Sequence, residues 1–545
     1  MSKQKKSKKT ILVGPVRQNL EAFGVAILAA VLLKWFCIEA YQIPTSSMQP
    51  TLMGSSEADV YDRILVDKLI QTWREPQRWD ITVFKYPLQK NQNYVKRIGG
   101  MPGDRLFIGG GNLYQVSGDG AARSFAPIRK PDDLQEQMWK NVFPARMETR
   151  SESKKLGEIW AASPGRAASE DGEDIKLSLS NGSARLFFRD EADGGMVDRV
   201  WDGYPAAVAS KIREKTIGYM MTQEIVPDCR LAATVTTEQT LDEFALEIDV
   251  SRPGNPKLTF AFVIRGDKAT LEVRDDKQTL GKSDEFACAL TAGTPTGLMF
   301  AHVDDMLIAW RDGDELQRFD TAAWAVRDGC VLPQKEGKLE FPINQRVVPQ
   351  FSARGKGNVT LQELRLDRDQ HYTRDQAPEV IEVPEGHYYM LGDNTLQSID
   401  SRGWTAITIG VDADDNVVPP DSPDAVRVLR GNKRPMPLGR TPDRDETPIA
   451  YPSEKAIVMI DEFGEIHRLN AEIGPNWGEP SDGSPVVFLG KDGQPWTAPT
   501  TTNTTGISFV PRSDIQGRAL LVFYPFRPFS WLTRNAWPDR FGFVR

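Results

Sequence analysis

Three neighbouring hydroxyl side chains lie between two prolines in the segment IPTSSMQPTL, residues 43–52. The segment follows the one stretch apolar enough to cross a membrane, AFGVAILAAVLLKWFCI at residues 22–38. A serine held there is poorly placed for a hydrophobic core and well placed for chemistry on a chain that emerges from a membrane. We therefore predict that Ser47 is a nucleophile, which needs a base to take its hydroxyl proton.

A candidate base lies in the strand-like segment YVKRI, residues 94–98. At the two-residue period of a strand, Lys96 and Ile98 share one face, and Val95 and Arg97 share the other. Burial of the first face would disfavour the ammonium form of Lys96 and lower its pKa. A lysine with a pKa of roughly 7 to 8 could accept the serine proton near neutral pH. The alternative is an ordinary solvated lysine.

A third polar group follows in VPEGHYYMLGDNTLQSIDSRGW, residues 383–404. A tight Gly-Asp-Asn turn leads to Ser398, Asp400 and Arg402 at alternate positions, which project to one side of an extended chain. Asp400 and Arg402 could form an ion pair and leave the Ser398 hydroxyl free to orient an amine. A solvated loop with a chance ion pair is the alternative.

The elements that must position these groups are short strands. Apolar alternation bounded by turn residues predicts strands within residues 62–68, 79–84 and 94–98, the last ended by the turn GGMPGD at residues 99–104. A chain of 545 residues exceeds one hydrophobic core, so about three or four domain-sized units are expected.

The amino terminus has the pattern of a membrane anchor. Its lysines precede any acidic residue, which places residues 1–19 in the cytoplasm as a basic tail and the chain after about Tyr41 outside. We predict a transmembrane signal-anchor at residues 20–42. A cleaved signal peptide also fits, although cleavage near Ala40 would separate the serine segment from its anchor.

Charge and residue usage exclude several classes of protein. The net charge of -8 is spread along the chain without a dense basic stripe beyond the first ten residues, so nucleic acid is not an expected partner. The cysteines lack paired spacing and the histidines are scattered singly, so we expect no metal or cofactor and no Ser-His-Asp triad. One disulfide is left open among Cys229, Cys288 and Cys330.

Four segments occur in one order behind this amino terminus: PTSSMQPTL, DRILVDKL, YVKRIGGMPGDRL and VPEGHYYMLGDNTLQSIDSR. In this order they resemble the bacterial type I signal peptidases, a Ser-Lys dyad family of serine proteases. The late segment FVPRSDIQGRA, residues 509–519, resembles the family's closing strand. The resemblance covers about residues 1–110, 380–405 and 506–525.

The resemblance implies catalytic roles for the matching residues. Ser47 matches the nucleophile and Lys96 the neutral general base. The Thr45 hydroxyl and the Ser47 backbone N–H would form the oxyanion hole. Ser398 would hydrogen-bond the lysine amine, supported by the Asp400–Arg402 ion pair.

The resemblance also implies a second ion pair, a substrate site and a location. Arg97 and Asp393 would pair in the scaffold, and Ile43, Pro44 and Val95 would line the substrate site, with pockets for the small side chains of A-x-A signal peptides. The expected substrates are exported preproteins. The protein would be single-pass in the cytoplasmic (inner) membrane, with its amino terminus in the cytoplasm and its catalytic domain outside.

The predicted fold is mainly β, with a signal-peptidase-like core in three parts, residues 43–110, 380–410 and 506–545. The first insertion, residues 111–379, contains alternating apolar runs and hairpin signals that predict a jelly-roll-like β-sandwich at about residues 220–370. Strand spacing there is similar to concanavalin-like jelly rolls, many of which bind glycans. Three tryptophans could stack on sugars, but core packing is favoured for Trp201, Trp310 and Trp324.

The second insertion, residues 411–505, begins with a predicted linker at residues 417–444. A hairpin is predicted at residues 457–469 and a low-complexity linker at residues 500–505. Two rival functions remain open. One is a membrane-tethered glycan-binding protein with a degenerate protease core, in which the sandwich binds a glycan or protein partner. The other is a self-cleaving Ser-Lys regulator, which would carry a DNA-binding unit.

Overall fold

A computed structural model describes most of the chain. The described residues are 15–55, 58–145, 159–164, 174–189, 195–204, 221–251, 255–326, 334–335, 338–339, 346–374, 377–432, 455–461, 463, 465–473, 487–502, 505–524 and 541–544.

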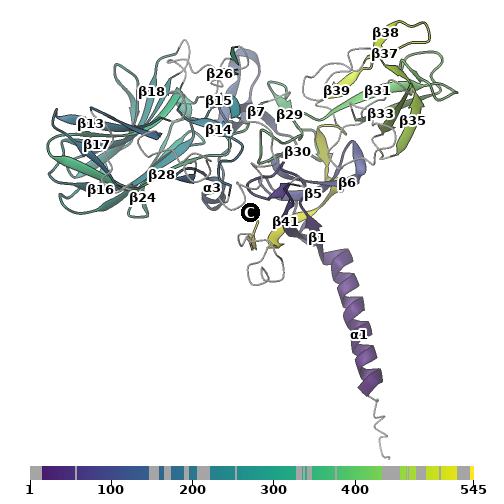
Figure 1. Ribbon diagram of the computed structural model, residues 1–545, viewed down its shortest axis with the longest axis horizontal. Helices are drawn as coiled ribbons and strands as arrows, with labels where there is room; N and C mark the ends of the chain where they lie inside the picture. Colours follow the sequence, from purple (N-terminus) through teal and green to yellow (C-terminus); the bar gives the residue numbers. More distant parts are fainter. Residues whose placement is uncertain are drawn as a thin grey trace, which may run out of the picture.

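The amino-terminal helix α1 (Pro15–Leu32) continues into a π-helical turn, Leu33–Cys37 (Figure 1). Residues 19–37 have a mean hydropathy of 1.9 and form the one helix of the described chain that is long and apolar enough to cross a membrane. The predicted span to residue 42 is too long, because Ile38–Gln42 form strand β1, which pairs with β4 (Arg63–Asp67). At about 3.3 Å per residue, β1 places the serine segment roughly 17 Å beyond the helix end.

An eight-stranded sheet forms the core, in the order β1-β4-β41-β5-β6-β30-β40, with β42 beside β41. It joins strands from the beginning, middle and end of the chain. The predicted closing strand becomes β40 and β41, and β41 lies inside the sheet between β4 and β5. The remaining members are β5 (Ile81–Tyr86), β6 (Gln89–Gly100), β30 (His387–Leu391), β40 (Phe509–Pro511), β41 (Ile515–Tyr524) and β42 (Gly542–Phe543).

Smaller elements flank this sheet. A four-stranded sheet has the order β29-β7-β8-β9, and β2 pairs with β3 just after the serine segment. A short helix, α3, follows β9. The bounds are β2 (Gly54–Ser55), β3 (Val60–Tyr61), α2 (Ile70–Trp73), β7 (Arg105–Gly109), β8 (Asn112–Ser117), β9 (Ser124–Pro127), α3 (Asp132–Met138) and β29 (Ile381–Glu382).

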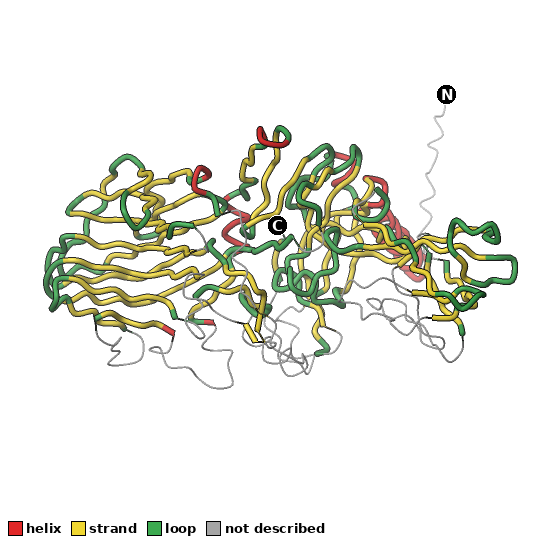
Figure 2. Tube along the Cα trace, turned by 90° about the horizontal axis from the view of Figure 1, so that it is seen from above, coloured by secondary structure: helices red, strands yellow, loops and turns green. Residues whose placement is uncertain are grey.

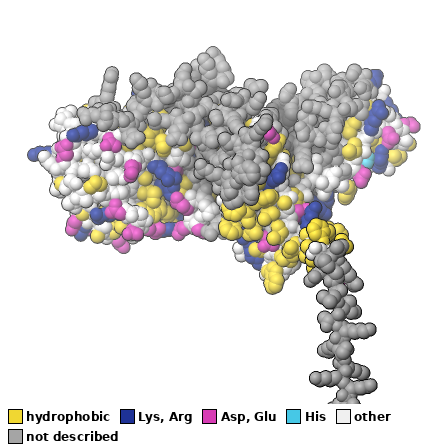
Figure 3. All heavy atoms as spheres, turned by 60° about the horizontal axis from the view of Figure 1, so that its bottom comes forward, with side chains coloured by type: hydrophobic (Ala, Val, Ile, Leu, Met, Phe, Trp, Pro, Cys, Tyr) yellow, Lys and Arg dark blue, Asp and Glu magenta, His cyan; other side chains and the backbone are white. Residues whose placement is uncertain are grey.

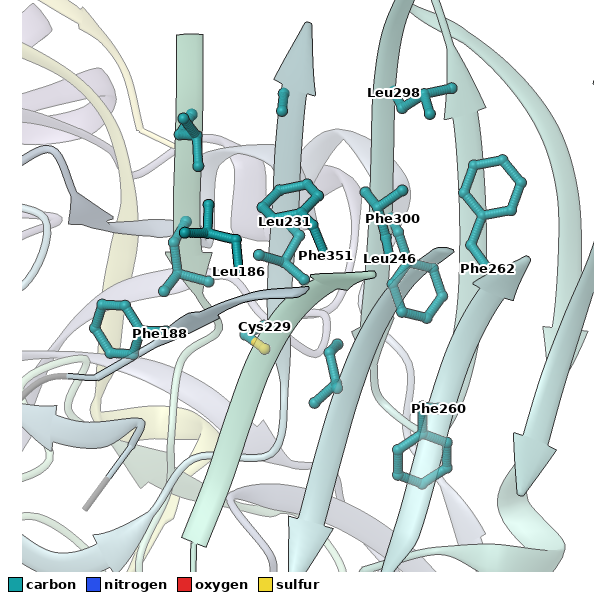
Figure 4. Close-up of a cluster of buried hydrophobic side chains, with 14 of the residues drawn as sticks. Leu186, Phe188, Cys229, Leu231, Leu246, Phe260, Phe262, Leu298, Phe300 and Phe351 are labelled. Atoms are coloured by element: carbon teal, nitrogen blue, oxygen red, sulfur yellow. The ribbon is translucent and has the colours of Figure 1, made fainter. Parts of the chain in front are cut away.

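Two antiparallel sheets of the first insertion pack face to face as a β-sandwich, at the left of Figures 1 and 2. Leu246, Phe260 and Phe351 from one sheet meet Leu231 and Phe300 from the other in one buried cluster (Figure 4). The alternating apolar residues of the sequence point into this core. The chain is therefore mainly β, as predicted.

The first sheet of the sandwich contains β10 (Lys140–Phe143), β12 (Ile175–Ser178), β16 (Cys229–Thr237), β22 (Thr296–Val303), β23 (Met306–Arg311), β24 (Asp314–Asp320) and β28 (Asn358–Arg368). The second contains β11 (Trp160–Ser163), β13 (Ser183–Phe188), β17 (Glu243–Ser251), β18 (Leu258–Arg265), β19 (Lys268–Arg274), β20 (Thr279–Lys282), β21 (Phe286–Ala287) and β27 (Arg346–Arg354). Two short pairs lie beside them: β14 (Val197–Arg199) with β15 (Met221–Ile225), and β25 (Gln334–Lys335) with β26 (Lys338–Leu339).

The sandwich begins earlier than the predicted residue 220, because β10 to β13 supply strands from residues 140–188. Four-residue strands such as β10 and β12 are too short to give a clear alternation in the sequence. The three tryptophans considered for sugar stacking each pack against buried apolar clusters. Cys37, Cys229 and Cys288 are free thiols, and Cys330 lies outside the described residues.

The second insertion forms small sheets at the upper right of Figure 1. The predicted hairpin is confirmed, with Ile457 opposite Leu469. The predicted linkers are wrong in part, because β33 and β39 pair with β31, a partner that composition cannot reveal. The strands are β31 (Thr405–Val411), β32 (Val417–Val418), β33 (Arg427–Asn432), β34 (Ala456–Ile460), β35 (Ile466–Asn470), β36 (Glu472–Ile473), β37 (Val487–Leu489), β38 (Pro495–Thr497) and β39 (Thr500–Thr502).

Candidate active site

The serine loop, residues 43–53, is fastened to the core sheet by buried apolar side chains. Ile43, Met48 and Leu52 pack in one cluster with Val83 of β5. Ser47 itself is half-buried. The Thr45 Oγ1 and Ser47 Oγ atoms lie 3.4 Å apart. No acceptor among the described residues takes a hydrogen bond from the Ser47 N–H.

Lys96 lies in β6, where it pairs with Thr82 of β5. Its exposed fraction is 3%, and Ile98 on the same face is fully buried. This burial decides against the solvated-strand interpretation of the sequence. The Nζ atom lies 6.0 Å from the centre of the Tyr94 ring, in a setting where desolvation disfavours an ammonium ion.

Ser398, Asp400 and Arg402 form one buried polar network. The Ser398 hydroxyl donates to Asp400 Oδ2 at 2.8 Å, and Arg402 donates to both carboxylate oxygens at 2.8 and 2.7 Å. Burial alone would raise the pKa of Asp400, but Arg402, with a further contribution from the charge of Lys96, holds it below its usual value. The lysine therefore lies within electrostatic reach of this carboxylate.

The sequence interpretation left the Ser398 hydroxyl free to orient an amine, and the structure corrects this. Its proton is already directed at Asp400, because a charged carboxylate is the stronger acceptor. The Ser398 oxygen therefore keeps its lone pairs for a donor such as a lysine amine. The ion pair with Arg402 fixes the hydroxyl through Asp400 and not through direct contact.

Gly392 brings this network against the nucleophile loop. A β-carbon built on Gly392 would lie 2.0 Å from Ser398 Oγ and 2.6 Å from the Ser47 carbonyl oxygen. The Gly392 N–H donates to Asp400 Oδ2 at 2.8 Å. Only a residue without a side chain fits, so Gly392 lets the two serine-bearing segments approach each other.

Arg97 and Asp393 form a second ion pair, in which both side chains are 1% exposed. Thr51 donates to Asp393 Oδ2 at 2.6 Å, which ties this pair to the serine loop. The charge of Arg97 opposes the effect of burial and leaves the pKa of Asp393 below its usual value. The remaining expected substrate residues lie in or against the serine loop: Ile43 and Val95 share its apolar cluster, and Pro44 is half-buried.

Three polar residues near Ser47 were not predicted from the sequence. Asn394 donates from its backbone to the Ser47 carbonyl at 3.1 Å and from its side chain to the Ser46 carbonyl at 3.0 Å. The Gly-Asp-Asn turn was a signal for Asn394. Tyr204 and Lys140, which reach this region from the first insertion, carried no local signal.

Three buried aspartates form the one candidate metal cluster among the described residues. Its members are Asp228, Asp304 and Asp369, whose oxygens lie within 4.8 Å of one another. The Lys130 ammonium contacts Asp304 at 2.7 Å and Asp369 at 2.8 Å, and so supplies positive charge there. The site around Ser47 contains none of these residues.

A family model described as signal peptidase, peptidase S26, matches residues 16–177 and 337–418. These ranges contain the serine loop, β6 and the network that follows Gly392. The core is therefore similar to the S26 signal peptidase family. The late strands β40 and β41 complete the sheet of this core from outside the matched residues.

Curated relatives named signal peptidase I match part of this chain. Signal peptidase I of Pseudomonas fluorescens is 38% identical over 110 residues, 16% of this chain and 37% of the relative. That of Aquifex aeolicus is 41% identical over 91 residues, 17% of this chain and 33% of the relative. That of Leptolyngbya laminosa is 31% identical over 129 residues, 22% of this chain and 59% of the relative. The chain thus spans little more than a third of the first relatives it matches.

Solved structures show weak likenesses to part of this chain. Carbohydrate binding module CBM66 from Bacillus subtilis has a TM-score of 0.23 and 7% identity, over 39% of this chain and 97% of the module. Sheep galectin-11 has a TM-score of 0.18 and 10% identity, over 26% of this chain and 92% of the galectin. Likenesses at this level assign no ligand to the sandwich.

Proposed function

We propose that this chain is a membrane-anchored serine endopeptidase that removes signal peptides from exported preproteins, with Ser47 as nucleophile and neutral Lys96 as general base. The observation that carries the proposal is the packing around Gly392. Its bare backbone lies against both Ser398 and Ser47, and the buried Lys96 lies within electrostatic reach of Asp400, which accepts a hydrogen bond from Ser398.

The reaction needs one base and one oxyanion site. The Lys96 amine takes the Ser47 proton as Oγ attacks the scissile carbonyl, and the resulting ammonium gives that proton to the leaving amine. The Ser47 N–H and the Thr45 hydroxyl donate to the carbonyl oxygen as its charge develops. Water, again deprotonated by Lys96, then hydrolyses the acyl-enzyme ester and releases Ser47.

The arrangement of Lys96 supports this role for a lysine. A solvated lysine stays charged at neutral pH and cannot accept a proton, whereas burial disfavours the charged form. The Ser398 oxygen can accept a hydrogen bond from the amine, because its own proton is directed to Asp400. Ser398 would thus direct the nitrogen lone pair of Lys96 toward Ser47.

The substrate would lie extended beside the serine loop. Ile43 and Val95 belong to one apolar cluster, which fits small side chains one and three residues before the scissile bond. Such side chains are the A-x-A pattern of secretory signal peptides.

The surface at the end of the apolar helix supports a location at the outer face of the cytoplasmic membrane. Apolar side chains gather where the helix meets the core (Figure 3). Trp35, Trp73 and Phe543 are 68%, 83% and 73% exposed. Trp35 lies in the turn before β1, Trp73 ends α2, and Phe543 lies in β42. Exposed aromatic side chains next to an apolar helix suit the membrane interface.

The test is preprotein cleavage by the full chain in proteoliposomes. Ser47→Ala and Lys96→Met should each abolish cleavage, whereas Ser46→Ala, a matched control on the neighbouring serine, should retain it. Wild-type activity in the Lys96→Met variant would reject the base assignment. Glycan binding by the full chain without any cleavage would instead favour the degenerate-protease alternative.

A further inference from the structure

Tyr204 reaches the serine loop from the first insertion. Its side chain is 4% exposed, and its hydroxyl donates to the Gln49 side-chain carbonyl. The same hydroxyl accepts a hydrogen bond from Asn394 Nδ2 at 3.3 Å. One phenol therefore contacts polar side chains on both sides of Ser47.

Gln49 and Asn394 converge on the same backbone atom. The Gln49 backbone N–H donates to the Ser46 carbonyl at 3.0 Å, and Asn394 Nδ2 donates to that carbonyl at the same distance. Gln49 Nε2 also donates to the Gly54 carbonyl at 2.7 Å, which closes the loop. The Tyr204 hydroxyl fixes the orientation of both side chains, since a phenol can donate once and accept at the same time.

Apolar packing and a buried arginine hold Tyr204 in place. Val200 and Tyr204 pack with Met53, the last residue of the serine loop, and with Val60 of β3. Arg368, at the end of β28 in the sandwich, donates to Asp202 and to the Arg199 carbonyl. The loop that carries Tyr204 is thus attached at one end to the sandwich and at the other to the catalytic core.

Lys140 makes a parallel contact. Its Nζ atom donates to the Asp393 carbonyl at 3.1 Å, one residue before Asn394. Lys140 lies in β10, whose neighbour in the sheet is β28. The sandwich therefore supports the active-site turn at two points.

We propose that Tyr204 is a positioning residue for Ser47, so that the first insertion is a working part of the catalytic unit and not a satellite. The inference rests on the proposed function, because positioning is measured through cleavage. A loop that is held by hydrogen bonds from two sides keeps the Ser47 hydroxyl aligned with its base, and small displacements of such a group reduce turnover steeply.

The experiment compares Tyr204→Phe with Tyr114→Phe in the full chain. Both changes remove one buried phenol oxygen, but Tyr114 faces Asp305 and Asn112. Tyr204→Phe should lower kcat about 10- to 100-fold with KM unchanged within about twofold, and Tyr114→Phe should change neither. In a Gln49→Leu background the loss caused by Tyr204→Phe should shrink, because the two residues act through one contact.

A second measurement does not depend on activity. Backbone hydrogen exchange at residues 46–52 should be faster in Tyr204→Phe than in wild type or Tyr114→Phe. An unchanged kcat together with unchanged exchange would overturn the proposal, as would a lower melting temperature with full kcat below the transition. If wild type and Ser47→Ala are equally inactive, the proposed function fails, and the exchange data alone then decide the role of Tyr204.

Discussion

The Arg97 guanidinium holds both carboxylate oxygens of Asp393, with Nε 2.9 Å from Oδ1 and Nη2 2.7 Å from Oδ2. The pair joins β6, which carries Lys96, to the turn that carries Asn394. Because Thr51 donates to the same carboxylate, three segments from distant parts of the chain meet at Asp393. The ion pair therefore aligns the segments that bear the candidate base and nucleophile.

Breaking this ion pair should destabilise the core strongly. Arg97→Met leaves the Asp393 charge buried without its partner, which should cost about 3–5 kcal/mol of unfolding free energy. The double variant Arg97→Met/Asp393→Asn should recover much of that loss, because no uncompensated charge remains. Chemical denaturation of the three proteins measures both effects. Equal loss in the single and double variants would contradict the charge argument.

A side chain at Gly392 should block catalysis. Gly392→Ala places a methyl group against Ser398 Oγ and the Ser47 carbonyl, so the two segments must separate. We expect a fall in kcat of about a hundredfold, as misplacement of reacting groups by about an ångström produces. Gly542→Ala is the control, because a β-carbon there meets nothing within 4 Å. Near-normal cleavage by Gly392→Ala would show that the segments need not touch.

Lys140 should make stability depend on pH in the alkaline range. Burial, followed by repulsion from Arg368, lowers the pKa of Lys140 from 10.5 to about 8, against the attraction of Asp198, Asp393 and Asp202. Between these two values the unfolded chain binds the proton and the folded chain does not. The contribution of Lys140 to stability therefore rises as the pH increases from about 8 to about 10.5, by about 3 kcal/mol.

The measurement is the difference in unfolding free energy between wild type and Lys140→Met from pH 7 to 11. Lys140→Met cannot titrate at this position, so any advantage of the variant should shrink across that window. Wild type and Lys140→Met share every other titrating group, so the contributions of those groups cancel in the difference. A difference that stays constant with pH would mean that the pKa of Lys140 is the same in the folded and the unfolded chain.

The local sequence predicted the individual strands and turns well, because alternation and turn chemistry act over a few residues. The hairpin from β18 to β19, for example, closes with Arg265 opposite Lys268. The predicted strand boundaries and helix end were less accurate. The predicted transmembrane span included residues 38–42, but these residues pair with β4 and form a strand. Tertiary pairing overrode composition there.

By itself, the sequence determined the residue types that could act as nucleophile, base and support, since their order and spacing lie within short segments. Only the tertiary structure decided which of them meet and which group donates each hydrogen bond. Ser398 donates to Asp400 because a carboxylate lies within reach, and Gly392 matters because two backbones converge on it. Tyr204 contacts Gln49 across 155 residues of chain, a separation over which no local pattern carries information.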